Sequence, residues 1–274
     1  MHLVDFEYNG ETLSEHGLTI CTFDSYDDSI DVGNNITINS VKAPNSEKHI
    51  SIATSYEDNL SVEFQVCSIS CETGEVSELA ITDEQLNELM RWLNRRGYYK
   101  FVPIYDDESF QDVYYNGTFN VKPIKIGNSI VGLNLTLQTN APYGFVEAPG
   151  KSFTFEDNDR EFVFFDTSDE IGCQYCDVTI KCLEAGNLII SNSLDTANDV
   201  IVYNCTEGET IVLKGESKII ETSSESHKTI HNDFNYRYLR IKNTYEDNKN
   251  VFTSTLKCEV SIEYSPIRKV GIVL

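Results

Sequence analysis

The amino-acid sequence predicts a mainly β protein with two domains and a single α-helix. Alternating apolar and polar residues, the pattern of a half-buried strand, recur along most of the chain. The chain also contains 15 Tyr and 14 Phe residues, which favour strands and are common at protein interfaces. Its 274 residues exceed what most single hydrophobic cores accommodate, whereas two domains fit that length.

In the first half, the alternation is clearest at residues 60–66 (LSVEFQV) and 131–137 (VGLNLTL). Two Asn-Gly pairs, Asn9-Gly10 and Asn116-Gly117, lie between strand-like runs. An Asn-Gly pair suits the two positive φ angles of a type I′ turn. The sequence therefore predicts several strands here, with a hairpin turn at each Asn-Gly pair.

Residues 82–96 are predicted to form the one α-helix. Thr82 is a favourable N-cap, and Gln85 occupies the capping-box position three residues later. Apolar residues at 86, 89, 90 and 93 follow the helical spacing, so one face of the helix is apolar. We expect the helix to pack on a sheet, with Trp92 at the flank of its buried stripe, and Gly97 to end it.

The domain boundary is predicted within residues 140–150, where two Pro and two Gly interrupt the strand pattern. This divides the chain into domains 1–145 and 146–274. Short strands spaced as in the second half favour a β-sandwich. The pattern comprises residues 162–165, 178–180, 188–190, 200–203, 211–213 and 256–264.

The chain is strongly acidic, with 44 Asp and Glu against 21 Lys and Arg. A net charge of −23 disfavours nucleic acid or an anionic membrane as the main partner, because each would repel it. The charge serves solubility, or it keeps a soluble pool from associating prematurely. The N-terminus lacks the pattern of a secretory signal and no apolar run has transmembrane length, so we expect cytosolic synthesis and free thiols at the eight Cys residues.

No metal site is predicted. His227 and His231 would share a helical face, but the surrounding Ser and Asn residues favour an exposed polar loop. The pairs Cys67/Cys71 and Cys173/Cys176 lie on opposite sides of the predicted boundary, and a single C-x2-C is a weak zinc signal. Residues 157–161 begin like a calcium loop, but Phe162 stands where that loop needs glycine.

Catalytic motifs are missing as well: the sequence contains no G-x-S-x-G, P-loop, G-x-G-x-x-G or H-E-x-x-H. We therefore predict a protein that is not an enzyme and needs no cofactor. An esterase or glycosidase is the least favoured alternative.

Several segments, read in order, resemble the distal tail proteins (Dit) of siphophages that infect Gram-positive hosts. The resemblance spans almost the whole chain, although its motifs are loose aromatic and apolar patterns with turn residues. The segments are 6–10 (FEYNG) with 17–20 (GLTI), 92–101 (WLNRRGYYKF), 114–119 (YYNGTF), 142–144 (PYG), 208–213 (GETIVL) and 234–241 (FNYRYLRI).

This resemblance implies a ring-forming N-terminal β domain with one helix, followed by a galectin-like or carbohydrate-module-like β-sandwich. The last strand, at about 265–274, is then expected to pack on the first domain. The implied role is a hexameric ring at the distal end of a long non-contractile tail. The ring would connect the tail tube protein to the tail-tip protein, or tail-associated lysin, and to the receptor-binding protein. Such a virion protein is made and assembled in the host cytoplasm. The alternative is a carbohydrate-binding module that recognises cell-wall glycan.

One basic patch stands out in the acidic chain. Arg91, Arg95 and Arg96, with Trp92 beside them, are candidate interface residues. We hypothesise that they contact an acidic surface of a neighbouring subunit. Compensation of the helix dipole at its C-terminus is an equally good explanation of the arginines.

Overall fold

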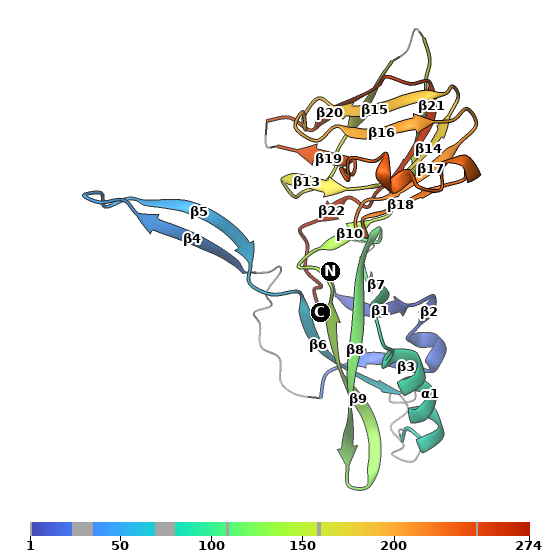
Figure 1. The fold of residues 1–274 in the computed structure, drawn as a ribbon. Helices are drawn as coiled ribbons and strands as arrows, with labels where there is room; N and C mark the ends of the chain where they lie inside the picture. Colours follow the sequence, from blue (N-terminus) through green and yellow to red (C-terminus); the bar gives the residue numbers. More distant parts are fainter. Residues whose placement is uncertain (1, 24–34, 69–79, 108–109, 158–159, 245) are drawn as a thin grey trace. The chain divides into compact units, whose positions relative to one another are not determined.

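The computed structural model describes residues 2–23, 35–68, 80–107, 110–157, 160–244 and 246–274, which fall into two compact units (Figure 1). One unit comprises Met1–Val146 together with Arg268–Leu274, and the other comprises Glu147–Ile267. The fold is mainly β with one α-helix among the described residues, which confirms the predicted fold class. Within the same residues, no helix has the length and hydropathy of a membrane span.

A nine-stranded sheet forms the framework of the first unit (Figure 1). Its main path runs through β2 (Glu11–Thr12), β1 (Leu3–Tyr8), β7 (Tyr99–Tyr105), β8 (Val113–Ile126), β9 (Ser129–Thr139), β6 (Ser61–Ser68) and β3 (Leu18–Cys21), and β10 (Gly144–Val146) and β22 (Ile267–Arg268) join off this path. The predicted strands at 60–66 and 131–137 are thus confirmed as β6 and β9. A short 3-10 helix, η1 (Ser14–His16), precedes β3.

The two Asn-Gly pairs behave differently. Asn9 and Gly10 have φ angles of 55° and 85° and connect β1 to β2, as predicted for a type I′ turn. The prediction for Asn116-Gly117 was wrong, because both residues lie inside the 14-residue strand β8. A Cβ atom on Gly117 would approach the Leu137 side chain to 2.6 Å, so this glycine allows β8 and β9 to pack closely.

The helix α1 spans Asp83–Leu93 and is shorter than predicted. Its start is confirmed: Thr82 accepts from the Gln85 N–H, and the Gln85 side chain accepts from the Thr82 N–H. Its end is not Gly97, because Asn94 already acts as the C-cap and donates its N–H to Met90. Trp92 is 3% exposed and therefore lies in the buried stripe itself, not at its flank.

An aromatic cluster fills the core of the first unit. The Phe6 ring stacks on Trp92 at 5.8 Å and meets Phe101 and Phe119 at 5.3 and 5.5 Å. The chain end joins this core, since Ile272 is buried in it. Residues 268–274 therefore belong to the first unit.

β4 (Ile36–Lys42) and β5 (His49–Tyr56) form a two-stranded sheet of their own, drawn in Figure 1 as a ribbon separate from the nine-stranded sheet. Both strands are antiparallel neighbours, joined by a short connection at residues 43–48. An isolated hairpin of this kind has little stability of its own in water.

The second unit is a β-sandwich. One sheet contains β11 (Lys151–Phe155), β21 (Cys258–Glu263), β14 (Asp177–Cys182), β17 (Thr210–Lys214) and β18 (Ile219–Thr222), and the other contains β12 (Glu161–Phe165), β20 (Lys249–Ser254), β15 (Gly186–Asn192) and β16 (Val200–Cys205). Inward side chains of both sheets share one core, as the alternating pattern predicts. A third pair, β13 (Gly172–Tyr175) with β19 (Arg240–Asn243), and the 3-10 helices η3 (Glu225–His227) and η4 (Ile230–Asn232) complete the unit.

Candidate functional site

The four predicted interface residues do not form one surface in the structure. Trp92 donates its indole N–H to the Tyr8 carbonyl at 3.0 Å and lies in the core, so it is not part of the surface. Arg95 donates from Nε to the Arg91 carbonyl at 3.1 Å, which satisfies a carbonyl at the helix end. Arg91 and Arg96 are exposed. The basic surface patch therefore contains the arginines without Trp92. Of these, Arg95 already donates a hydrogen bond to the helix backbone.

The β4–β5 hairpin carries a group of exposed aliphatic side chains. In the register, Ile36 faces Tyr56 and Val41 faces Ile50 across the two strands. Five aliphatic side chains of the hairpin are between 53% and 67% exposed. They are Ile36, Ile38, Val41, Ile50 and Ile52.

The register places these side chains on both faces of the hairpin. Successive residues of a strand point to opposite faces, so Ile36 and Ile38 share one face of β4, whereas Val41 would point to the other. The register shifts between Asn39 and Ser40, where the partner strand contributes one extra residue. Because the extra residue lies in β5, the alternation of β4 is unchanged, and Val41 and its partner Ile50 lie on the face opposite to Ile36 and Ile38.

The hairpin also differs in charge from the rest of the molecule. Residues 36–56 contain two Lys and a single Glu, within a chain of net charge −23. One lysine, Lys42, pairs with Glu47 at 2.8 Å, and Lys48 gives the hairpin its excess positive charge. The alternating I-T-I and I-S-I patterns at 36–38 and 50–52 are the sequence signal that could have predicted this hairpin.

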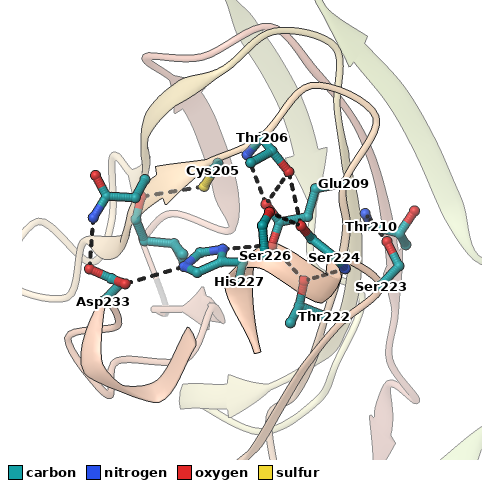
Figure 2. Close-up of polar contacts among 12 residues, drawn as sticks. Cys205, Thr206, Glu209, Thr210, Thr222, Ser223, Ser224, Ser226, His227 and Asp233 are labelled. Atoms are coloured by element: carbon teal, nitrogen blue, oxygen red, sulfur yellow. Dashed lines mark hydrogen bonds and ion pairs between the residues drawn. The ribbon is translucent and has the colours of Figure 1, made fainter. Parts of the chain in front are cut away.

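The second unit contains a buried ionic network around His227 (Figure 2). The prediction of an exposed loop was wrong for this histidine, which is 4% exposed, whereas His231 is exposed. His227 Nδ1 lies 2.7 Å from Glu209 Oε1, and Nε2 lies 3.4 Å from Asp233 Oδ2. Glu209 and His227 are 18 positions apart and belong to no motif, so no sequence signal marked the pair.

Hydrogen bonds stabilise the charge of Glu209. Burial by itself would raise the pKa of this carboxyl, but hydrogen bonds from Thr222, from the Thr206 backbone and from His227 lower it below its usual value. The Thr222 hydroxyl donates at 2.5 Å and the Thr206 N–H donates at 2.8 Å. The network thereby joins the turn after β16 to the segment after β18.

The surroundings of His227 indicate a structural role for this residue and not a catalytic one. His227 is oriented by an acid, as a catalytic histidine would be, but its other nitrogen faces Asp233 and has no hydrogen-bonding hydroxyl. Across the described ranges, no group of three His, Cys, Asp or Glu side chains could hold a metal ion.

Of the candidate zinc pairs, Cys67 and Cys176 are buried and Cys173 is exposed. Cys71 lies outside the described residues, as do residues 158–159 of the candidate calcium loop. The seven described cysteines are free thiols.

Comparison with known proteins covers both units. Residues 1–141 match a family model described as a phage tail protein N-terminal domain, and residues 143–264 match one described as a phage tail C-terminal domain. The chain is also similar to a solved structure of SPP1 Dit (gp 19.1), whose title calls it a paradigm of the hub adsorption apparatus in phages that infect Gram-positive bacteria. That similarity has a TM-score of 0.63 at 10% identity and covers 97% of this chain and 99% of the other. No curated protein sequence matches the chain significantly.

Proposed function

Because this chain belongs to the phage tail protein family that both models describe, and has the fold of a distal tail protein, we propose that it forms a ring of identical subunits at the distal end of the tail. The ring, of six copies by the resemblance noted in the sequence, joins the tail tube protein to the tail-tip and receptor-binding proteins. Its place in the virion is then the tail tip. Its role is assembly and not catalysis, which agrees with the absence of catalytic motifs.

The exposed aliphatic side chains of the β4–β5 hairpin are the observation that carries this proposal. Five exposed aliphatic side chains on one hairpin are unfavourable in water unless another surface covers them. The hairpin is also basic in net charge, whereas a copy of the same chain is acidic. A neighbouring subunit therefore offers a partner of complementary charge.

A ring requires a head-to-tail contact in which two different surfaces of one subunit meet. The hairpin supplies one such surface. Arg91 and Arg96 are exposed at the end of α1 and supply a second basic surface for the acidic exterior of a neighbour. Contacts of this kind are screened by salt, whereas contacts through the aliphatic side chains of the hairpin are not.

The test is the mass of the purified chain in solution, with negative-stain microscopy of any particle. We expect a closed oligomer for the wild type and monomers for the double variant Ile38→Asp, Ile52→Asp, because two buried charges would oppose the hairpin contact. Ile219→Asp is the matched control, since Ile219 is exposed on β18 in the second unit. A wild type that stays monomeric at high concentration, or a double variant that assembles normally, would contradict the proposal.

A further inference from the structure

Two buried cysteines of the second unit face each other across neighbouring strands. Cys182 is the last residue of β14, and Cys258 is the first residue of β21. The two residues are direct partners in the antiparallel register of these strands. Both are 0% exposed and belong to the same hydrophobic core. Their thiols therefore point into one core from adjacent positions.

Backbone hydrogen bonds identify the kind of pair that these cysteines form. Opposite residues of an antiparallel ladder alternate between hydrogen-bonded and non-hydrogen-bonded pairs, and side chains are closer in the second kind. The Cys182 N–H donates to the Glu209 carbonyl, and the Cys182 carbonyl accepts from the Gly208 N–H, both at 2.8 Å. Both partners lie just before β17, and β17 and β21 flank β14 on opposite sides. Neither backbone group of Cys182 is thus directed toward Cys258.

The next pair along the two strands agrees with this pattern. The Leu183 N–H donates to the Lys257 carbonyl at 2.9 Å, so the ladder bond lies one residue beyond the cysteines. A non-hydrogen-bonded pair has a Cα–Cα distance of about 4.5 Å. A disulfide requires a Cα–Cα distance of about 4.4–6.8 Å. The backbone geometry therefore allows a disulfide between Cys182 and Cys258 with little movement of either strand.

A third buried thiol, Cys205, is a less suitable partner for Cys182. It is the last residue of β16, which belongs to the other sheet of the sandwich. Facing sheets pack about 10 Å apart, which exceeds the Cα–Cα distance of a disulfide. The Cys205 thiol also donates to the Val202 carbonyl at 3.5 Å within its own strand.

Both cysteines of the pair lie where the sheet ends. The turns that follow β14 and precede β21 include the exposed residues Ala185 and Thr255. Strand ends open by local fluctuation at a smaller free-energy cost than the centre of a sheet. Opening of this end gives small molecules access to the pair while the rest of the sandwich stays folded.

The surroundings of the two thiols keep them protonated at neutral pH. Burial raises the pKa of Cys258 to about 11. A hydrogen bond from its thiol to Cys205, together with burial, raises the pKa of Cys182. Because the thiolate is the reactive form, the reduced pair is stable in a reducing cytosol and reacts slowly with an oxidant.

We propose that Cys182 and Cys258 form a disulfide when the chain meets an oxidising small-molecule disulfide, and that this bond staples the β-sandwich. The Cys258 thiolate attacks the external disulfide and releases one thiolate. The Cys182 thiolate then attacks the Cys258 sulfur of the mixed disulfide and releases the second. The protein thiols lose two protons and two electrons, and the external disulfide becomes two thiols.

The bond would join two central strands of the five-stranded sheet and close a loop that contains β15 to β20. A cross-link over a long loop restricts the unfolded chain and so stabilises the fold. It would also fix Cys182, whose backbone holds the turn that carries Glu209. The use of such a staple rests on the proposed place in the virion, which leaves the reducing cytosol, whereas formation of the bond does not.

Refolding of the full-length chain in a mixture of oxidised and reduced glutathione tests the geometry, because every thiol is accessible in the unfolded chain. Mass spectrometry of proteolytic fragments then locates the bond. We expect the Cys182–Cys258 disulfide, a loss of two hydrogen atoms, and a calorimetric midpoint of the second unit about 5 °C or more above that of the dithiothreitol-reduced chain.

The folded chain, treated with oxidised glutathione alone, tests the redox control. The same bond should form about tenfold faster for each unit of pH between pH 7 and pH 9, because the thiolate fraction of Cys258 rises by that factor. A folded chain that stays reduced at pH 9 would overturn the redox control.

Cys205→Ala is the matched control, because it removes a thiol of the same core and should leave the bond intact. Cys258→Ala should form no bond, and its midpoint should be the same with and without oxidant. A refolded wild type without the Cys182–Cys258 bond, a bond mapped to Cys182 and Cys205, or an oxidised midpoint no higher than the reduced one would overturn the proposal. The monomeric hairpin variant should form the bond normally, which separates this result from failure of the ring.

Discussion

Glu209 has a fully buried side chain in a chain whose acidic residues are numerous and mainly exposed. Such a carboxylate is stable only where donors replace its lost water. Thr206, Thr222 and His227 supply these donors, and together they lower the pKa of Glu209. At the residue scale, this network connects three separate segments of the second unit.

The depressed pKa predicts a pH dependence of stability. Because the folded state holds the Glu209 proton less tightly than the unfolded chain, the contribution is present above the unfolded pKa of about 4.5 and is lost as pH falls through the folded pKa. Glu209→Gln should lower the free energy of unfolding by about 1–3 kcal/mol at neutral pH, because buried donors lose their acceptor. The difference from wild type should shrink below about pH 4.5.

Denaturant unfolding of both proteins between pH 3 and pH 8 measures this difference. Glu207→Gln is the matched control, since Glu207 is exposed in the same turn and should change stability little. A Glu209→Gln variant as stable as the wild type at neutral pH would show that the network contributes nothing to the fold.

At the scale of the element, local contacts explain which predictions succeeded. The start of α1 was predictable because the capping box joins residues only three apart. The end of α1 was not, because Asn94 ends the helix and Arg95 reaches back to its last turn. Likewise, the packing of β9 against Gly117 placed that glycine in a strand, and no local property of an Asn-Gly pair reveals such packing.

The capping box yields a second prediction. Thr82→Ala should lower the free energy of unfolding of the first unit by about 1 kcal/mol, because the Gln85 N–H loses its acceptor. Thr82→Ser keeps a hydroxyl in the same position and serves as the control. Thermal unfolding followed by the fluorescence of Trp92, the chain's one tryptophan, reports on this unit. Equal stability of the Ala and Ser variants would contradict the role of the cap.

On the scale of the whole molecule, the last seven residues of the chain pack in the first unit. Ile272 is buried in its aromatic core. The Tyr115 hydroxyl donates to the Val270 carbonyl at 2.9 Å, and the Val273 N–H donates to the Tyr105 hydroxyl at 3.3 Å. Consistent with its burial, the pKa of Tyr115 is raised. The first unit is therefore built from both ends of the sequence.

Truncation after Ile267 should destabilise the first unit by about 3–5 kcal/mol, from one buried aliphatic side chain and two hydrogen bonds. The Trp92 unfolding transition should shift to lower temperature, while a calorimetric transition of the second unit should remain. Ile272→Ala, which keeps the backbone contacts, should give a smaller shift of the same sign. An unchanged Trp92 transition in the truncated chain would show that the terminal segment is dispensable.

The sequence by itself determined the β character, the strands β6 and β9, the Asn9-Gly10 turn and the start of the one helix. Each of these depends on side-chain periodicity or on contacts between residues a few positions apart. Only the tertiary structure decided that Trp92 is buried, that His227 pairs with Glu209, and that the β4–β5 hairpin leaves five aliphatic side chains exposed. These features depend on which distant segments become neighbours, and burial, register and pairing are properties of those neighbours and not of the local sequence.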